Sequence, residues 1–178
     1  MGSPVTTQCV CDPQPLAQRW ALSAHRSPLF RHIRCHFNTL QEMTARRGPC
    51  IFHSRNDCCR LPRTSPDLVT IGMPCQPFSL QRGDRKTVSP QKHASFQVML
   101  DFLKYTKAIR PWGGICEEVL GFTNDISESR WVPTAYCDAM PKSWCDWFCA
   151  TLREQGYAVR CFKLDNAWFS DIPRPRPI

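Results

Sequence analysis

Two stretches of the chain repeat apolar residues at the spacing of an amphipathic helix. In residues 94–109, "ASFQVMLDFLKYTKAI", large apolar side chains recur at steps of three and four residues. Further along, Trp144, Phe148 and Leu152 follow one another at steps of four. Gly156 comes soon after this second run, as is typical of a helix end. We expect a helix in each stretch.

Three shorter runs have the composition of β-strands. They are "DLVTIG" at residues 67–72, "WGGICEEV" at 112–119 and "YAVRCFKL" at 157–164. The first is β-branched and lies between a proline and a glycine, which predicts a buried strand. Together with the helices, the order is strand, helix, strand, helix, strand. This order predicts an α/β fold with crossover helices and a mostly parallel sheet.

Reactive side chains follow the first two of these strands. Cys75 lies in a loop directly after residues 67–72, and Glu117 and Glu118 stand near the end of the second strand. In open α/β sheets, ligands gather at the carboxyl ends of the strands. This edge of the sheet is therefore the predicted functional site.

The remaining segments show little periodicity. Prolines and clusters of arginine, cysteine and histidine interrupt residues 1–48, so we expect an irregular, partly disordered segment there, followed by a domain over residues 49–178. Residues 123–141 are expected to form an irregular insert. Residues 80–93, "LQRGDRKTVSPQKH", are polar and basic. They indicate either a surface loop that closes over a phosphate backbone or a merely solvated stretch.

The charge of the chain favours an anionic partner without proving one. Lys and Arg number 23 against 15 Asp and Glu, which gives a net charge of +8 and a pI near 9.0. A basic surface that is only solvated explains this excess equally well. No apolar run reaches the length of a membrane-spanning helix, so we expect no membrane partner.

The chain has twelve cysteines, which raises the question of disulfides or metal. Residues 1–20 lack the continuous apolar core of a signal peptide, so we expect free thiols in a reducing compartment, the nucleus if the cell is eukaryotic. No Cys-x-x-Cys pair occurs, and we therefore expect no bound metal. The pairs set aside on this ground are Cys9/Cys11, Cys58/Cys59 and Cys145/Cys149. His32, Cys35 and His36 could share a helix face, but we interpret them as scattered residues of that face.

Cys75 differs from the other cysteines in its neighbours. Pro74 and Pro77 restrict the backbone around it, while Gln76 and Ser79 offer polar contacts. Most cysteines are small buried hydrophobes, so Cys75 taken alone is more simply interpreted as one more buried thiol. A stiff loop at a strand end is nevertheless where a preorganised nucleophile is placed.

Residues 67–79, "DLVTIGMPCQPFS", resemble the catalytic loop of the cytosine-C5 DNA methyltransferases. In that family a hydrophobic strand ends in glycine and is followed by Pro-Cys-Gln and then Phe-Ser. Three further blocks are similar to the family in the same order, and the resemblance covers residues 49–178. The blocks are Glu117-Glu118-Val119 for Glu-Asn-Val, Gly156-Tyr157-Ala158-Val159 for Gly-Tyr-x-Val, and Asn166-Ala167 with "IPRPRPI" for Asn-Ala and Val-Pro-Gln-x-Arg-x-Arg.

The resemblance implies a partial Rossmann-like methyltransferase fold and methyl transfer from S-adenosyl-L-methionine to C5 of cytosine in DNA. A thiolate that adds to C6 makes C5 electron-rich, and in the family this thiolate belongs to the cysteine of Pro-Cys-Gln, here Cys75. The glutamate of Glu-Asn-Val, here Glu117, stabilises charge at N3 of the base. The other implied contacts are Arg176 to the base, Pro74 to the cofactor, and Gln76, Ser79 and Arg82 to the substrate.

The chain departs from the family pattern at several positions. Glu118 replaces the asparagine of Glu-Asn-Val, Arg174 replaces the glutamine of the last block, and Ile178 replaces its second arginine. Nothing in residues 1–48 matches the Phe-x-Gly-x-Gly turn that holds the cofactor, or the acidic residue after the second strand. The target-recognition region is missing as well. We therefore interpret the sequence as a fragment or a degenerate copy of such an enzyme.

Two alternatives remain open at this point. One is a non-catalytic relic that binds nucleic acid in a salt-sensitive way through Arg82, Arg85, Lys86 and Lys92. The other is an RNA cytosine methyltransferase, because no residue of the chain distinguishes deoxyribose from ribose. DNA is thus the expected partner and RNA the alternative one.

Overall fold

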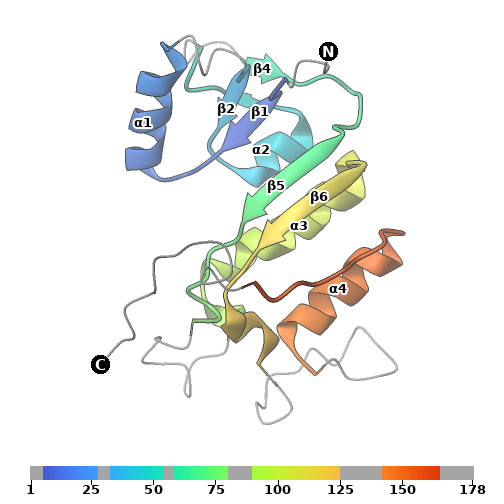
Figure 1. The fold of residues 1–178 in the computed structure, drawn as a ribbon. Coiled ribbons are helices and arrows are strands. Elements are labelled where there is room, and N and C mark those ends of the chain that lie inside the picture. The colour runs from blue at the N-terminus through green and yellow to red at the C-terminus, as the bar shows by residue number, and fades with distance from the viewer. Residues whose placement is uncertain (1–5, 28–32, 54–57, 80–89, 125–141, 165–178) are drawn as a thin grey trace. The chain divides into compact units, whose positions relative to one another are not determined.

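The computed structural model divides the chain into two compact units. The first consists of Met1–Pro77 and Lys86–Glu118, and the second of Phe78–Arg85 and Val119–Ile178. Figure 1 shows the elements in chain order from blue to red. Within the described part of the chain, no helix has the length and apolar character needed to cross a membrane. The residues described are 6–27, 33–53, 58–79, 90–124 and 142–164.

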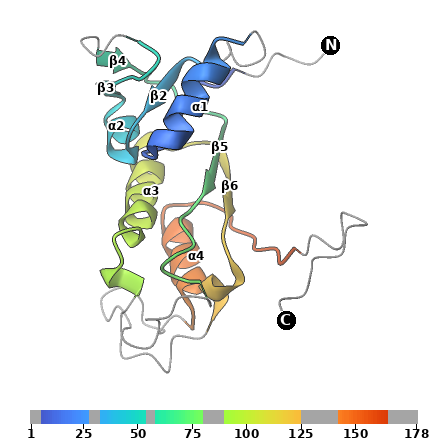
Figure 2. The same cartoon turned by 90° about the vertical axis from the view of Figure 1, so that its left-hand side faces the viewer.

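A parallel strand pair joined by a helix forms the centre of the first unit. β5 (Leu68–Gly72) pairs with β6 (Gly113–Glu117), with Leu68 opposite Gly113 and Gly72 opposite Glu117. α3 (Phe96–Ile109) connects the strands and lies along one face of the pair (Figures 1 and 2). Both strands and the helix form where the hydrophobic pattern predicts them. This β-α-β unit confirms the predicted α/β character of the fold.

α3 buries most of its predicted apolar stripe. Phe96, Met99 and Leu103 are buried, whereas Leu100 is only half-buried. Arg110 ends the helix in the left-handed conformation, with φ at 58°. The spacing of the apolar residues therefore predicts both the helix and the face that it turns toward the core.

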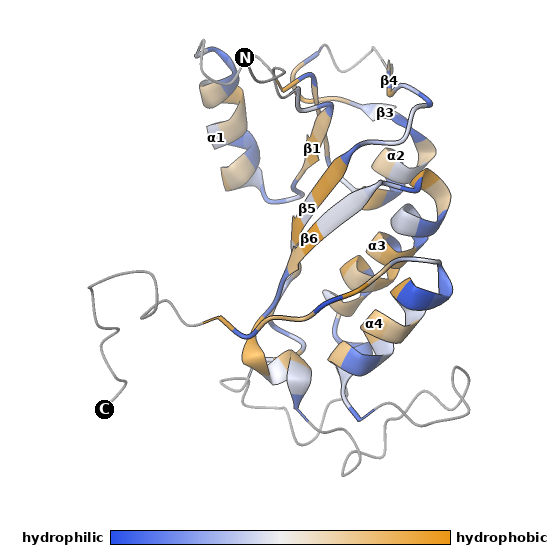
Figure 3. Ribbon diagram, turned by 45° about the vertical axis from the view of Figure 1, so that its right-hand side comes forward, coloured by the Kyte–Doolittle hydropathy of each residue, from blue (hydrophilic) through white to orange (hydrophobic). Residues whose placement is uncertain are grey.

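One face of the β5–β6 pair is largely exposed, contrary to the prediction of a buried strand. Leu68 is 57% exposed and Ile115 is 61% exposed, while Val69 and Ile71, on the opposite face, are half-buried. In Figure 3, β5 is coloured as a mainly hydrophobic strand. The run of apolar residues predicts the strand correctly, but burial on both faces depends on other layers of structure, which one strand cannot reveal.

Regular elements also make up the N-terminal part of this unit. β1 and β2 form a second parallel pair, with Cys9 opposite Cys35, and β3 and β4 form an antiparallel pair. α1 connects β1 to β2, so this part again has a β-α-β order. The bounds are β1 (Cys9–Cys11), α1 (Pro15–His25), β2 (Cys35–Phe37), α2 (Leu40–Ala45), β3 (Arg47–Pro49) and β4 (Cys58–Arg60).

These elements correct the expectation that residues 1–48 are irregular. Pro15 lies in the first turn of α1, where its missing N–H is not needed, and Pro49 is the last residue of β3. The strands are only three residues long, which is too short for a period to be recognised. Cys35 and His36 belong to β2 rather than to a helix, so their side chains point to opposite sides of the strand.

α2 begins at a reciprocal cap. The Thr39 hydroxyl accepts a hydrogen bond from the Glu42 N–H at 3.2 Å, and Glu42 Oε2 accepts one from the Thr39 N–H at 3.2 Å. Arg46 ends the helix in the left-handed conformation, with φ at 54°. This capping box satisfies backbone donors that a helix start otherwise leaves open, and it stabilises a helix of six residues.

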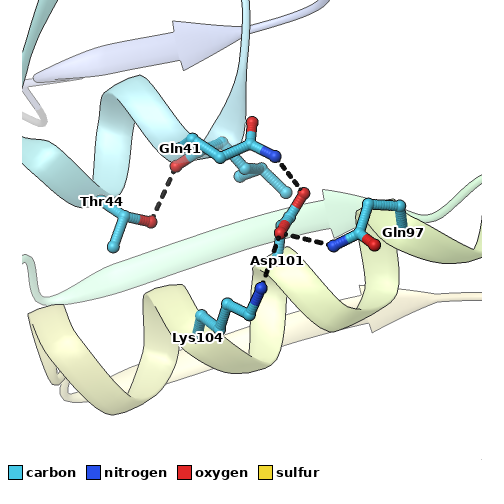
Figure 4. Close-up of polar contacts among 6 residues, drawn as sticks. Gln41, Thr44, Gln97, Asp101 and Lys104 are labelled. Atoms are coloured by element: carbon cyan, nitrogen blue, oxygen red, sulfur yellow. Dashed lines mark hydrogen bonds and ion pairs between the residues drawn. The ribbon is translucent and has the colours of Figure 1, made fainter.

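Asp101 on α3 connects this helix to α2 (Figure 4). Its buried carboxylate accepts hydrogen bonds from the side-chain amides of Gln41 on α2 and Gln97 on α3, the second at 2.9 Å. Lys104 Nζ lies 3.5 Å from the same carboxylate, on a side chain that is 71% exposed. Because Asp101 meets donors from both helices, it fixes α2 against α3.

The second unit is organised around α4 (Trp144–Glu154) and the short 3-10 helix η3 (Leu120–Thr123). The ring centroid of Phe122 lies 5.9 Å from that of Phe148 and 4.8 Å from that of Phe78, and both pairs meet edge to face. Trp144, Phe148 and Leu152 are all buried, which confirms the predicted helix and its apolar face.

The strand predicted for residues 157–164 does not form. These residues have no regular secondary structure, and Phe162 and Leu164 are 77% and 66% exposed. An alternating pattern makes a strand only when a neighbouring strand accepts its backbone hydrogen bonds. Here Arg153 donates a hydrogen bond from its guanidinium to the Val159 carbonyl at 3.2 Å instead.

We expect Asp101→Ala to destabilise the first unit by about 2 kcal/mol, because the change leaves the Gln41 and Gln97 amides without their buried acceptor. Urea denaturation followed by circular dichroism measures this change. Lys104→Ala is the matched control, since an exposed ion pair contributes only about 0–1 kcal/mol. Equal effects of the two substitutions would show that Asp101 does not fix α2 against α3.

Candidate active site

The carboxyl ends of β5 and β6 lie side by side and bring Glu117 next to the start of the Cys75 loop. Gly72, the last residue of β5, is opposite Glu117, the last residue of β6. The Met73 N–H donates a hydrogen bond to the Glu117 carbonyl at 3.3 Å. A Cβ atom placed on Gly72 would be 3.5 Å from Glu117 Oε2. The Glu117 carboxylate therefore lies over the strand end from which the loop departs.

The Cys75 loop is held by buried residues on either side of the thiol. Met73 is 6% exposed and Pro77 is almost fully buried, whereas Cys75 itself is half-buried and Gln76 is exposed. Cys75 follows Gly72 by three residues, so its Cα lies within about 11 Å of the Gly72 Cα. Pro74 and Pro77 restrict the backbone between these anchors. This arrangement fixes the loop and leaves the thiol accessible, as a nucleophile requires.

The structure describes five of the seven residues predicted for the site. Glu117 ends β6 beside the end of β5, from which the loop with Cys75 departs, and Pro74 lies in the same loop, half-buried. The other two described residues, Gln76 and Ser79, lie on either side of the buried Pro77-Phe78 pair in sequence, and Ser79 is half-buried. Arg82 and Arg176 lie outside the described residues, so their roles stay predictions.

Cys9 and Cys11, at the two ends of β1, are poor candidates for the nucleophile. Burial raises the pKa of the Cys9 thiol to about 11 and the pKa of the Cys11 thiol to about 12. Because the thiolate is the reactive form, neither thiol is activated at neutral pH.

Cys116 is exposed on β6 next to Glu117, but consecutive strand residues point to opposite faces. Cys116 therefore serves as a matched control for Cys75.

The cysteines that the structure describes are free thiols, and six of them fall into two clusters, one of which also includes a histidine. Burial is the main cause that raises the pKa of Cys35 to about 12. In the second cluster, a hydrogen bond from Cys149 lowers the pKa of Cys145, and the same bond raises the pKa of Cys149. Cys75 belongs to neither cluster. The clusters are Cys35/Cys50/His53/Cys59 and Cys145/Cys149/Cys161.

Polar side chains that the sequence interpretation missed stand at the ends of β1 and β2. Asp12 directly follows β1, and its carboxylate accepts a hydrogen bond from the Gln14 N–H at 2.8 Å. The Gln18 side-chain amide donates to Asn38 Oδ1, just after β2, at 2.9 Å and to the Asp12 carbonyl at 2.9 Å. Gln18 thus bridges the two strand ends. Asp12 gives a signal in the sequence for this polar strand end, because it is an acidic residue that follows a short apolar run and precedes the start of a helix.

These strand ends fit one part of S-adenosyl-L-methionine. Asp12 places a carboxylate at the end of β1, where it is able to accept hydrogen bonds from ribose hydroxyls, whereas the acidic residue of the family follows the second strand and this chain has Asn38 after β2. The glycine-rich turn of the family has no counterpart in residues 1–48, where the only glycines are Gly2 and Gly48. The residues present thus offer hydrogen-bond acceptors for a nucleoside and no counterpart of the glycine-rich turn.

The Cys75 loop lies in a part of the chain that matches a known protein family. A sequence model of the C-5 cytosine-specific DNA methylases matches residues 51–177. This range includes the Cys75 loop, β6 and the last arginine block, but it begins after β3. Neither a search of curated proteins nor a search of solved structures gave a match.

Proposed function

Because the chain belongs to the C-5 cytosine-specific DNA methylase family, we propose that it transfers a methyl group to C5 of cytosine in DNA. The observation that carries this proposal is the register of the β5–β6 pair, which places Glu117 beside the strand end that leads to Cys75. A nucleophile and an acid on neighbouring strand ends suit C6 and N3, which lie on opposite sides of one flat base. DNA is the proposed substrate and S-adenosyl-L-methionine the proposed cofactor.

Cys75 is proposed to attack C6 of the cytosine as a thiolate. The new S–C6 bond directs ring electrons toward C5 and N3, so that C5 becomes able to attack a methyl sulfonium. S-adenosyl-L-methionine supplies that methyl group when it is bound. Loss of the C5 proton to solvent then returns an electron pair to the ring, breaks the S–C6 bond and releases Cys75 as a thiolate. The base must first leave the helix stack, which costs a few kcal/mol.

Glu117 is proposed to hold N3 of the base. Negative charge accumulates toward N3 during attack at C6, and a carboxyl group that shares a proton with N3 stabilises this charge. Glu117 is exposed and lies over Gly72, so its carboxyl group is accessible to a base. In the same scheme Arg176 contacts the base, and Gln76, Ser79 and Arg82 contact the substrate strand.

The ends of β1 and β2 are proposed to bind the nucleoside part of the cofactor. Asp12 would accept hydrogen bonds from the ribose hydroxyls, and the side-chain amide of Asn38 would contact the adenine edge. Pro74, at the end of β5, is the third proposed contact. The support for this step is the parallel β1–β2 pair and the Gln18 bridge that fixes both polar residues at its end.

We expect the purified chain to form a covalent adduct with a 5-fluorocytosine DNA duplex in the presence of S-adenosyl-L-methionine. The fluorine cannot leave as a cation, so the enzyme stays bound after methyl transfer. Cys75→Ala is expected to abolish the adduct, because no thiolate remains to attack C6. Denaturing electrophoresis and intact mass spectrometry measure the adduct, and Cys116→Ala is the control that should retain it.

The same experiment separates the proposal from its rivals. Salt-sensitive DNA binding that Cys75→Ala leaves unchanged, without an adduct in the parent chain, favours a non-catalytic binding protein. An adduct with 5-fluorocytosine RNA but not with DNA favours an RNA methyltransferase. An adduct that persists in Cys75→Ala assigns the nucleophile to another cysteine.

Glu117→Gln is expected to slow adduct formation by about 10²–10⁴-fold, because an amide cannot share a proton with N3 as the carboxyl group does. Single-turnover kinetics on the same duplex measure this rate. The matched control is Glu118→Gln, in which the adjacent carboxyl group is changed in the same way and the rate is expected to stay close to that of the parent chain. A larger loss in Glu118→Gln would transfer the proposed role to Glu118.

Asp12→Asn is expected to weaken S-adenosyl-L-methionine binding by about 10–100-fold, since a charged hydrogen bond contributes about 1.5–3 kcal/mol. Isothermal titration calorimetry measures the affinity. Asp67→Asn is the control, because Asp67 is an exposed carboxylate before β5, at the opposite end of that strand from the Cys75 loop. An unchanged affinity in Asp12→Asn would remove Asp12 from the cofactor site.

A further inference from the structure

A second set of reactive side chains gathers in the first unit, separate in sequence from the Cys75 loop. The ligand atoms of its four members all lie within 4.8 Å of one another. Two of the thiols, Cys35 and Cys50, are 7% and 2% exposed, while Cys59 is half-buried and His53 is exposed. The cluster therefore has a buried thiol side and an imidazole that faces solvent. Its members are Cys35, Cys50, His53 and Cys59.

The local fold explains why residues so far apart in sequence meet. β3 and β4 pair with Gly48 opposite Cys59, so Cys50, two residues after Gly48, lies close to the β4 chain. The His53 N–H donates a hydrogen bond to the Cys50 carbonyl at 3.3 Å, which closes a turn and brings both side chains to the same place. The result is a Cys-x-x-His turn beside a cysteine-bearing strand.

β2 adds the remaining thiol and a backbone donor to the cluster. The Ile51 N–H donates to the His36 carbonyl at 3.1 Å, which fixes the turn against β2, where Cys35 is located. The His36 N–H in turn donates to Cys50 Sγ at 3.3 Å. Backbone N–H groups that point at a ligand sulfur orient it and stabilise its thiolate form.

The distances agree with the geometry of a tetrahedral metal site. Zn–S bonds of about 2.3 Å place two sulfur ligands about 3.8 Å apart at tetrahedral angles. The four ligand atoms already lie within 4.8 Å of one another, and His53 Nδ1 is 2.9 Å from Cys59 Sγ. A shift of about 1 Å is thus enough to surround one ion. Three thiolates and one imidazole are soft ligands that favour zinc over magnesium or calcium.

From this arrangement we propose that the first unit binds one structural zinc ion through four side chains, Cys35, Cys50, His53 and Cys59. All four ligand positions come from the protein, so the site is closed and has no place for a substrate. It ties β2, β3 and β4 together, where each strand has only three residues and little apolar area of its own. This proposal differs from our expectation of no metal, which rests on the absence of Cys-x-x-Cys pairs and does not consider Cys50-x-x-His53.

The other cysteine cluster is a weaker candidate for the same role. It consists of Cys145 and Cys149 on α4 and Cys161 after the helix, with Cys161 Sγ 3.8 Å and 3.3 Å from the two helix thiols. A closed structural zinc site needs four ligands, and among the described residues this cluster offers three. It therefore provides the control variant for the test.

The test uses the whole chain, purified under reducing conditions and loaded with Zn²⁺ or Co²⁺. We expect one zinc ion per chain by elemental analysis. With Co²⁺ we expect the visible bands of a tetrahedral site and the thiolate charge-transfer band. His53→Ala is expected to weaken Zn²⁺ binding by more than about 100-fold, since changes outside the ligand shell already cost about 10–100-fold. Because His53 is exposed, this variant should have the same fold as the metal-free parent chain, which circular dichroism checks.

Matched variants distinguish the proposed site from other thiols. Cys50→Ser should lose the zinc and the cobalt bands, whereas Cys149→Ser and Cys116→Ser should keep them. The proposal is overturned if the parent chain takes up no stoichiometric Zn²⁺ or Co²⁺, if His53→Ala binds the metal as tightly as the parent, or if Cys149→Ser loses it. None of these readouts depends on methyl transfer, so failure of the zinc site and failure of the proposed function are distinguishable.

Discussion

The register of the β5–β6 pair is the constraint on which the candidate active site depends. A slip of one residue would turn Glu117 to the other face of the pair and remove it from Gly72. Hydrogen bonds at the opposite end of the strands resist such a slip, because the Gly113 N–H donates to the Asp67 carbonyl at 3.0 Å. The Ser65 hydroxyl also donates to the Ile109 carbonyl at 3.1 Å, which ties the end of α3 to the start of β5. The position of Glu117 at one end of the pair thus depends on backbone contacts at the other end.

Polar and sulfur contacts stabilise the part of the first unit that precedes β5. The strands there have three residues each, so they bury little apolar surface and add few ladder hydrogen bonds. A capping box starts α2, and Asp101 holds that helix to α3. The proposed zinc ion would act in the same way between β2 and the β3–β4 pair. Small elements of this kind need directed contacts because hydrophobic burial alone does not suffice.

The sequence predicts most reliably the helices and strands whose hydrophobic pattern extends over many residues. The helices around Met99 and Phe148 and the strands at β5 and β6 form as expected, since their patterns are long or bounded by clear breaks. Three-residue strands carry no period, so β1 to β4 were missed, and the prolines near them were interpreted as interruptions rather than as ends. The exposure of Leu68 and the absence of a strand at residues 157–164 both depend on neighbours that the local pattern does not contain.

The environments of the cysteines explain how one thiol of a cysteine-rich chain can be set apart for chemistry. Burial keeps Cys9 and Cys11 protonated, because a charged sulfur is poorly solvated there. The thiols of the proposed zinc site would be thiolates, yet a bound cation makes them ligands rather than free nucleophiles. Cys75 lies in neither environment: its loop is anchored by buried residues, and the thiol is half-exposed beside a strand end that carries an acid. Cys116 is likewise exposed and outside both clusters, but it precedes Glu117 on β6 and so points to the opposite face, whereas Cys75 lies in the loop that leaves the strand end beside Glu117.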